Sequence, residues 1–103
     1  MTRPWIIENG RSDDLTDLRP LLASAGLPVE ALEDALPDGL LVARSGGSLI
    51  GAVALQPAGV DALLRSLVVH PDWRGRGLGE ALVTTVEALA RARGVGRLYL
   101  LTE

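Results

Sequence analysis

The sequence predicts a mixed α/β domain, and three observations carry that prediction. Three apolar stretches, at residues 40–44, 49–55 and 60–69, are separated by short glycine-containing turns, which is the pattern of an antiparallel meander. The third stretch leads through a glycine-rich loop into a helical pattern and then into another apolar stretch at 97–101, as in a strand–helix–strand crossover. The chain has 103 residues, so one domain at most is expected.

The N-terminal part is predicted to begin with a short strand, Trp5 to Glu8, and a turn at 9–12. Leucines then recur at helical spacing as far as Gly26, which is expected to end a helix. Pro20 is poorly tolerated deep inside a helix, so the regular helix is expected to begin near Asp17. A second short helix is expected from residue 28 to residue 36.

The meander and the crossover are predicted from turn residues and apolar spacing. Gly46 and Gly47 suit the left-handed positions of a two-residue hairpin turn, and residues 56–59 are expected to form the next turn. From Gly77 onward the apolar spacing is helical, and Gly94 is the expected residue after the helix. The predicted buried face of this helix consists of Leu78, Leu82, Val86 and Leu89. The strands on either side of it should be parallel.

Composition excludes several classes of function. The chain is 48% apolar but only 3% aromatic, so the core must be aliphatic. A net charge of −3 argues against a nucleic-acid partner. The absence of cysteine excludes disulfides and thiolate catalysis, and one histidine cannot form a metal cluster, so no metal is predicted. The apolar runs are too short to span a bilayer and no secretory leader is present, so a cytoplasmic protein without a membrane partner is expected.

The stretch from Val68 to Gly79 has the features of an anion site. An apolar strand ends at Val69, Pro71 cannot donate to a sheet, and a helix is predicted to begin among the glycines that follow. The start of a helix carries unpaired N–H groups and the positive end of the helix dipole. Two arginines add positive charge, so residues 74–79 are predicted to form a cradle for a phosphate or diphosphate. The alternative is a glycine-rich turn without a ligand.

The spacing of the cradle residues narrows the choice of motif. Glycines at 75, 77 and 79 do not fit the dinucleotide fingerprint, and no Lys-Ser/Thr pair follows as in a P-loop. The pattern Arg-x-x-Gly-x-Gly at 74–79 resembles the acetyl-CoA-binding signature of the GNAT (Gcn5-related) N-acetyltransferase superfamily. The resemblance implies the GNAT acyl-CoA N-acyltransferase fold, as a single domain over residues 1–103. Residues 63–67 and 97–102 are also similar to the arsenic-resistance branch, which is related to phosphinothricin-type acetyltransferases.

This resemblance implies acetyl-CoA as co-substrate and transfer of its acetyl group to the amine of a small molecule, with an amino-acid-like toxin as a candidate. It implies that the pantetheine arm pairs with the backbone of Leu67, Val68 and Val69. It assigns the pyrophosphate to the cradle residues, which are Arg74, Gly75, Arg76, Gly77, Leu78 and Gly79. A backbone N–H near Val69 is expected to donate to the carbonyl oxygen on which charge develops.

Candidates for handling the acceptor amine are few. Arg65 is expected near the acceptor, where it could hold a substrate carboxylate; the alternative is an ordinary surface arginine. No catalytic base is identified, and Glu8 and Asp61 are the weak candidates; a position in a solvent turn is the favoured interpretation of Asp61. Three side chains are expected respectively to cap the strand end, to cover the loop and to pack: His70, Trp73 and Tyr99.

The sequence given stops at Glu103, whereas members of this superfamily continue with a helix and two antiparallel strands. The resemblance implies that this region carries the tyrosine that protonates the leaving thiolate. Three alternatives are open: a truncated product, a fragment of a longer protein, or a subunit completed by a partner, for example in a homodimer. The leading hypothesis is an N-acetyltransferase, and the alternative is an acyl-CoA-binding module with impaired catalysis.

Overall fold

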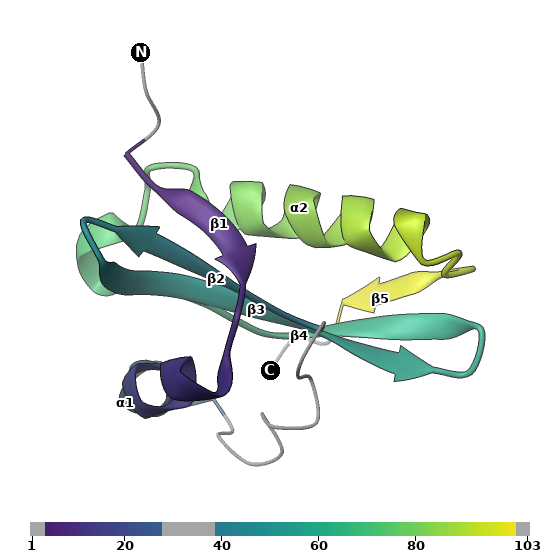
Figure 1. The fold of residues 1–103 in the computed structure, drawn as a ribbon, viewed down its shortest axis with the longest axis horizontal. Coiled ribbons are helices and arrows are strands. Elements are labelled where there is room, and N and C mark those ends of the chain that lie inside the picture. Colours follow the sequence, from purple (N-terminus) through teal and green to yellow (C-terminus); the bar gives the residue numbers. More distant parts are fainter. Residues whose placement is uncertain (1–3, 28–38, 101–103) are drawn as a thin grey trace.

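The computed structural model describes residues 4–27 and 39–100, which form a five-stranded sheet with a helix on each face (Figure 1). In chain order, which is also their order in the sheet, the strands are β1 (Ile6–Asn9), β2 (Leu40–Ser45), β3 (Ser48–Ala58), β4 (Asp61–Val69) and β5 (Leu98–Leu100). The first four pair antiparallel, and β5 pairs parallel to β4. The predicted mixed sheet, meander and crossover are confirmed.

The two helices lie on opposite faces of the sheet and each covers its own apolar cluster (Figure 1). Helix α1 (Leu15–Ser24) packs on the face that includes Leu40 and Val42 of β2. Helix α2 (Leu78–Ala92) packs on the face that includes Leu41 and Ala43 of the same strand. Successive residues of a strand point to opposite faces, so this continuously apolar strand is buried on both sides.

A bulge in β4 changes which residues face α2. Ala52 of β3 pairs with Val68 and Ala54 pairs with Arg65, so two residues of β4 lie opposite one residue of β3. Ser66, one of these two, has φ of +59°, which is uncommon for a residue with a side chain. Before the bulge Leu64 belongs to the α2 cluster, and after it Val68 belongs to the α1 cluster. The alternation of β4 side chains between the two faces of the sheet is therefore shifted by one residue after the bulge.

Helix α1 begins earlier than predicted. A 3₁₀ turn at Ser12–Asp14 precedes it, the helix starts at Leu15, and Pro20 lies inside it. The predicted start near Asp17 is wrong because burial of four leucines outweighs the hydrogen bond that Pro20 cannot donate. The second predicted helix falls on residues 28–36, which lie outside the described residues.

The turn expected at 56–59 is also wrong. β3 continues to Ala58, and the hairpin turn consists of Gly59 and Val60. Pro57 is tolerated in the strand because β2 pairs with β3 only as far as Ala54, which leaves this part of β3 with a neighbour on one side. By contrast, the glycine hairpin at 46–47 is confirmed, with φ of +57° and +85°.

Helix α2 ends as the sequence predicts. Gly94 has φ of +73°, its N–H donates to the Arg91 carbonyl at 3.1 Å, and the Val95 N–H donates to the Ala90 carbonyl at 3.0 Å, which is a Schellman cap. The buried face is Leu78, Leu82, Val86 and Ala90, with Leu89 only partly buried. Neither α1 nor α2 combines the length and the apolarity needed to cross a membrane.

Candidate functional site

The predicted cradle lies between the end of β4 and the first turn of α2. After Val69 the chain forms a 3₁₀ turn at Pro71–Trp73. The Nδ1 atom of His70 accepts a hydrogen bond from the Asp72 N–H at 3.1 Å, so His70 caps this turn as expected. The Trp73 N–H donates to the His70 carbonyl at 2.8 Å, which closes the turn and directs the chain into the glycines.

Two of the cradle glycines are required by the backbone. Gly75 and Gly77 have φ of +75° and +85°, the left-handed region that disfavours residues with a Cβ. A Cβ placed on either would meet no atom within 4 Å, so the space above both is open. A Cβ on Gly79 would lie 3.7 Å from Val69 Cγ2, an ordinary contact. The cradle therefore presents bare backbone to solvent at Gly75 and Gly77.

The start of α2 supplies hydrogen-bond donors. Gly77 is the N-cap, and no side chain caps the helix. The first helical hydrogen bond runs from the Ala81 N–H to the Gly77 carbonyl at 3.0 Å. The N–H groups of the first turn before Ala81 are those that a helix leaves without an internal partner. They carry the positive end of the dipole, so this surface favours an anion.

Both cradle arginines are held by groups near the loop. Arg74 Nε donates to the Val69 carbonyl at 3.2 Å, and the Arg76 guanidinium carbon lies 4.8 Å from the centroid of the Trp73 ring. Within residues 4–27 and 39–100, neither arginine forms an ion pair. Two positive charges therefore remain available beside the start of the helix.

The free edge of β4 next to the cradle is the second part of the site. The His70 N–H donates to the Ile50 carbonyl at 2.7 Å, and antiparallel N–H groups alternate in direction, so the Val69 N–H points away from β3. Pairing with β5 reaches only to Leu64 and Leu100. In the described part of the chain no strand pairs with residues 65–69 on this edge. The edge is thus open to an extended ligand.

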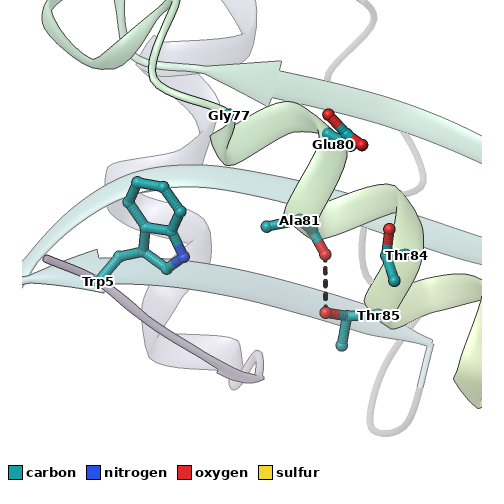
Figure 2. A pocket seen from close by; sticks show the side chains of 6 residues that line it. All are labelled: Trp5, Gly77, Glu80, Ala81, Thr84 and Thr85. Atoms are coloured by element: carbon teal, nitrogen blue, oxygen red, sulfur yellow. Dashed lines mark hydrogen bonds between the residues drawn. The ribbon is translucent and has the colours of Figure 1, made fainter. Parts of the chain in front are cut away.

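A shallow hollow of about 340 Å³ flanks the same end of α2 and was not predicted from the sequence (Figure 2). Its lining residues are Trp5, Gly77, Glu80, Ala81, Thr84 and Thr85. The Trp5 Nε1 atom is buried and has no hydrogen-bond partner in the part of the chain that the structure describes, whereas Thr85 Oγ1 donates to the Ala81 carbonyl at 2.7 Å. Nothing in the sequence links residue 5 to residues 77–85, because only the sheet and α2 bring them together.

Glu8, one of the two base candidates, belongs to an ion-pair network on β1 and β2. Arg44 Nε donates to the Glu8 carboxylate at 3.1 Å, and another nitrogen of Arg44 donates to the Asp14 carboxylate at 2.6 Å. Burial of Asp14 opposes its ionisation, but hydrogen bonds from Arg44 and the Arg11 N–H outweigh burial, so the pKa of Asp14 lies below its ordinary value. This network ties β1, the 3₁₀ turn and β2 together.

The other two predicted side chains lie along β4, away from the cradle. Asp61 is the first residue of β4 and Val69 the last, so at 3.3 Å per residue they are roughly 26 Å apart. Arg65 is closer, next to the bulge, and donates to the Gln56 side-chain oxygen at 2.8 Å. The roles of Glu8, Asp61 and Arg65 in catalysis or substrate binding remain predictions. Tyr99, expected to pack, is 46% exposed, because β5 lies at the edge of the described sheet.

Comparison with known proteins identifies the family. The model of the acetyltransferase (GNAT) family matches residues 9–103. The chain belongs to the GNAT family. Among curated GNAT-like relatives, it is 38% identical over 65 residues to an acetyltransferase of Pectobacterium atrosepticum, covering 63% of this chain and 46% of that protein. It is 39% identical over 75 residues to an amino-acid acetyltransferase of Shewanella oneidensis, covering 71% of this chain and 17% of that protein. The chain thus spans less than half the length of these relatives.

Solved structures agree with the GNAT fold. N-acetylglutamate synthase from Neisseria gonorrhoeae, complexed with coenzyme A and N-acetyl-glutamate, superposes with a TM-score of 0.85 at 24% identity, covering 99% of this chain and 26% of that one. A ribosomal-protein-alanine N-acetyltransferase from Brucella melitensis gives a TM-score of 0.75 at 27% identity, covering 96% of this chain and 80% of that one. The described strands and helices are therefore arranged as in GNAT acyltransferases.

Proposed function

We propose that this GNAT chain transfers the acetyl group of acetyl-CoA to the amine of a small, amino-acid-like molecule. The observation that carries the proposal is the cradle at residues 74–79, where two left-handed glycines, open space and the N–H groups of a helix start coincide with two arginines that form no ion pair within the described residues. These features fit a diphosphate, which is the anionic part of coenzyme A. Family membership supports the same co-substrate.

In this proposal each part of the site has a separate role. Acetyl-CoA supplies a thioester carbonyl that an amine can attack. The backbone from Arg74 to Gly79 holds the diphosphate, and the open edge of β4 at Leu67–Val69 pairs with the pantetheine arm. The Val69 N–H, which points away from β3, donates a hydrogen bond to the carbonyl oxygen as negative charge develops on it.

The proposed acceptor class rests on two relatives and one side chain. One relative is named an amino-acid acetyltransferase, and one structural neighbour is a synthase complexed with N-acetyl-glutamate. Arg65 keeps further donors after its bond to Gln56, and a guanidinium suits the carboxylate of an amino acid. Neither Glu8 nor Asp61 is assigned as the base, and we expect the amine proton to leave through water. A cytoplasmic location, a homodimer and the arsenic-resistance branch stay predictions.

One alternative is favoured by a specific observation. Among the described residues neither base candidate is placed to act, because Glu8 is ion-paired with Arg44 and Asp61 lies roughly 26 Å along β4 from Val69. The alternative is therefore an acyl-CoA-binding module with impaired transfer, in which the cradle keeps its proposed role. The two functions differ in whether an amine releases thiol from acetyl-CoA.

The test combines a binding measurement with a transfer measurement on the whole chain. Calorimetry with CoA should give a dissociation constant in the micromolar range, and a thiol-detecting reagent should register CoA release from acetyl-CoA in the presence of an amino-acid panel. Binding with release supports the acetyltransferase, and binding without release for any amine supports the module. Absence of CoA binding at millimolar concentration would refute both functions.

A further inference from the structure

Two tryptophans and one arginine from distant parts of the chain meet beside the cradle. Trp5 precedes β1, and its ring packs edge-on against Trp73, with centroids 6.3 Å apart and planes at 76°. Trp73 lies in the 3₁₀ turn, and the Arg76 guanidinium carbon lies over its ring, 4.8 Å from the ring centroid. Both rings also pack against the apolar cluster under α2. We call these three residues the Trp5–Trp73–Arg76 stack.

We propose that Trp73, supported by Trp5, is a positioning residue that holds the Arg76 guanidinium ready for the coenzyme diphosphate. This inference rests on the proposed coenzyme-binding function. Trp73 itself does not contact the diphosphate in this proposal, and it acts only through Arg76. The sequence predicts that Trp73 covers the loop; this proposal gives it a further role, because the Arg76 guanidinium lies over its ring.

The charge environment of Arg76 supports a ligand-directed role. In the described residues Arg76 has no acidic partner, although Glu8, Asp14 and Arg44 show that this fold pairs its charges elsewhere. A guanidinium over an indole is attracted by the ring but keeps its in-plane N–H groups free. Arg76 is therefore restrained without losing its donors, which reduces the rotamer freedom that binding must remove.

Trp5 supplies support by packing rather than by hydrogen bonding. Its Nε1 atom is buried and has no hydrogen-bond partner among residues 4–27 and 39–100, so no hydrogen bond there fixes the indole in the stack. The two indoles form a T-shaped pair, and a phenyl ring can form the same kind of pair. Trp5→Phe therefore keeps an aromatic contact with Trp73 but removes the N–H and part of the ring volume that packs under α2, so it is a conservative variant of the support.

A double-mutant cycle on CoA affinity tests the proposal. We expect Arg76→Ala to weaken CoA binding about tenfold or more, because a charge-assisted contact with the diphosphate is lost. Trp73→Leu should weaken binding roughly three- to tenfold in the wild-type background and by less than about twofold in the Arg76→Ala background. Trp5→Phe should weaken CoA binding less than Trp73→Leu does, whereas Val60→Ala, an exposed side chain in the hairpin at the far end of β4, should bind CoA within about twofold of wild type. In transfer assays, Trp73→Leu and Arg76→Ala should each raise KM for acetyl-CoA and leave kcat unchanged.

The outcomes separate this inference from the function on which it rests. A wild-type chain that does not bind CoA refutes the proposed function, whereas additive effects of Trp73→Leu and Arg76→Ala refute only the positioning role. If Trp73→Leu does not fold, Trp73→Phe replaces it, because phenylalanine attracts a cation less than tryptophan. For Trp73→Phe, a two- to threefold loss of CoA affinity that disappears in the Arg76→Ala background supports the positioning role, and an unchanged CoA affinity overturns it.

Discussion

Replacing Gly77 by aspartate is the sharpest test of the cradle, because the structure separates its effect on folding from its effect on binding. A Cβ at Gly77 meets no atom within 4 Å, so the folding cost is the left-handed backbone alone, about 1–2 kcal/mol. A carboxylate at the start of a helix stabilises the folded state by roughly 0.3–1 kcal/mol. We therefore expect the free energy of unfolding to fall by only about 1 kcal/mol.

The effect of Gly77→Asp on coenzyme binding should be much larger. A carboxylate about 5 Å from one diphosphate charge, at an effective dielectric constant near 20, repels it by roughly 3 kcal/mol. This corresponds to a loss in CoA affinity of about 100-fold. Calorimetry with CoA measures the affinity, and urea unfolding measures the stability of the same sample.

Gly59→Asp is the matched control for this experiment. Gly59 also has a left-handed φ, +69°, and open space for a Cβ, but it lies in the hairpin at the far end of β4. We expect a loss of stability of about 1–2 kcal/mol, because no helix dipole offsets the backbone cost here, and no change in CoA affinity. A folded Gly77→Asp protein that binds CoA within threefold of wild type would show that the diphosphate does not lie on this helix start.

Three further predictions concern the scaffold. Gly51→Ala should lower the free energy of unfolding by about 1–3 kcal/mol in urea, because a Cβ there would lie 3.2 Å from Leu78 Cδ2 beneath α2; unchanged stability would contradict this packing. Asp14→Asn should cost about 2 kcal/mol at pH 7. Folding lowers the pKa of Asp14, so its contribution is fully present above the pKa of the unfolded chain, about 4, and is lost as pH falls through the lower pKa of the folded chain; the difference between wild type and variant in urea unfolding should shrink as pH falls below about 4. Ser66→Gly should raise Tm by a few degrees, since it relieves a left-handed φ of +59°, and a lower Tm would argue that the hydroxyl stabilises the bulge.

Sequence patterns predicted the parts of the fold that local chemistry determines. The hairpin at Gly46 and Gly47 and the cap at Gly94 follow from residues that adopt left-handed conformations, and the structure has them where they were expected. The start of α2 at the cradle follows from the change in apolar spacing after Gly77. The parallel pairing of β4 with β5 follows from the intervening helix.

The remaining errors come from tertiary contacts that no local pattern contains. Pro57 suggests a turn, but β3 continues through it because β2 ends its pairing earlier. Pro20 suggests a late helix start, yet the buried leucines of α1 keep the residues before it helical. Serine has no particular preference for positive φ, so the bulge at Ser66 could not be read from its residues. The contact of Trp5 with Trp73 joins positions 68 residues apart (73 − 5).

The pairing of the two indoles has a practical consequence. They are the only tryptophans in the chain and both lie at one corner of the molecule, next to the first turn of α2. Tryptophan fluorescence therefore reports on that corner and responds little to changes in the distant hairpin at Gly59. A local opening would alter the emission while the far-ultraviolet circular dichroism of the sheet and helices stays the same, so the two signals together distinguish fraying of this corner from global unfolding.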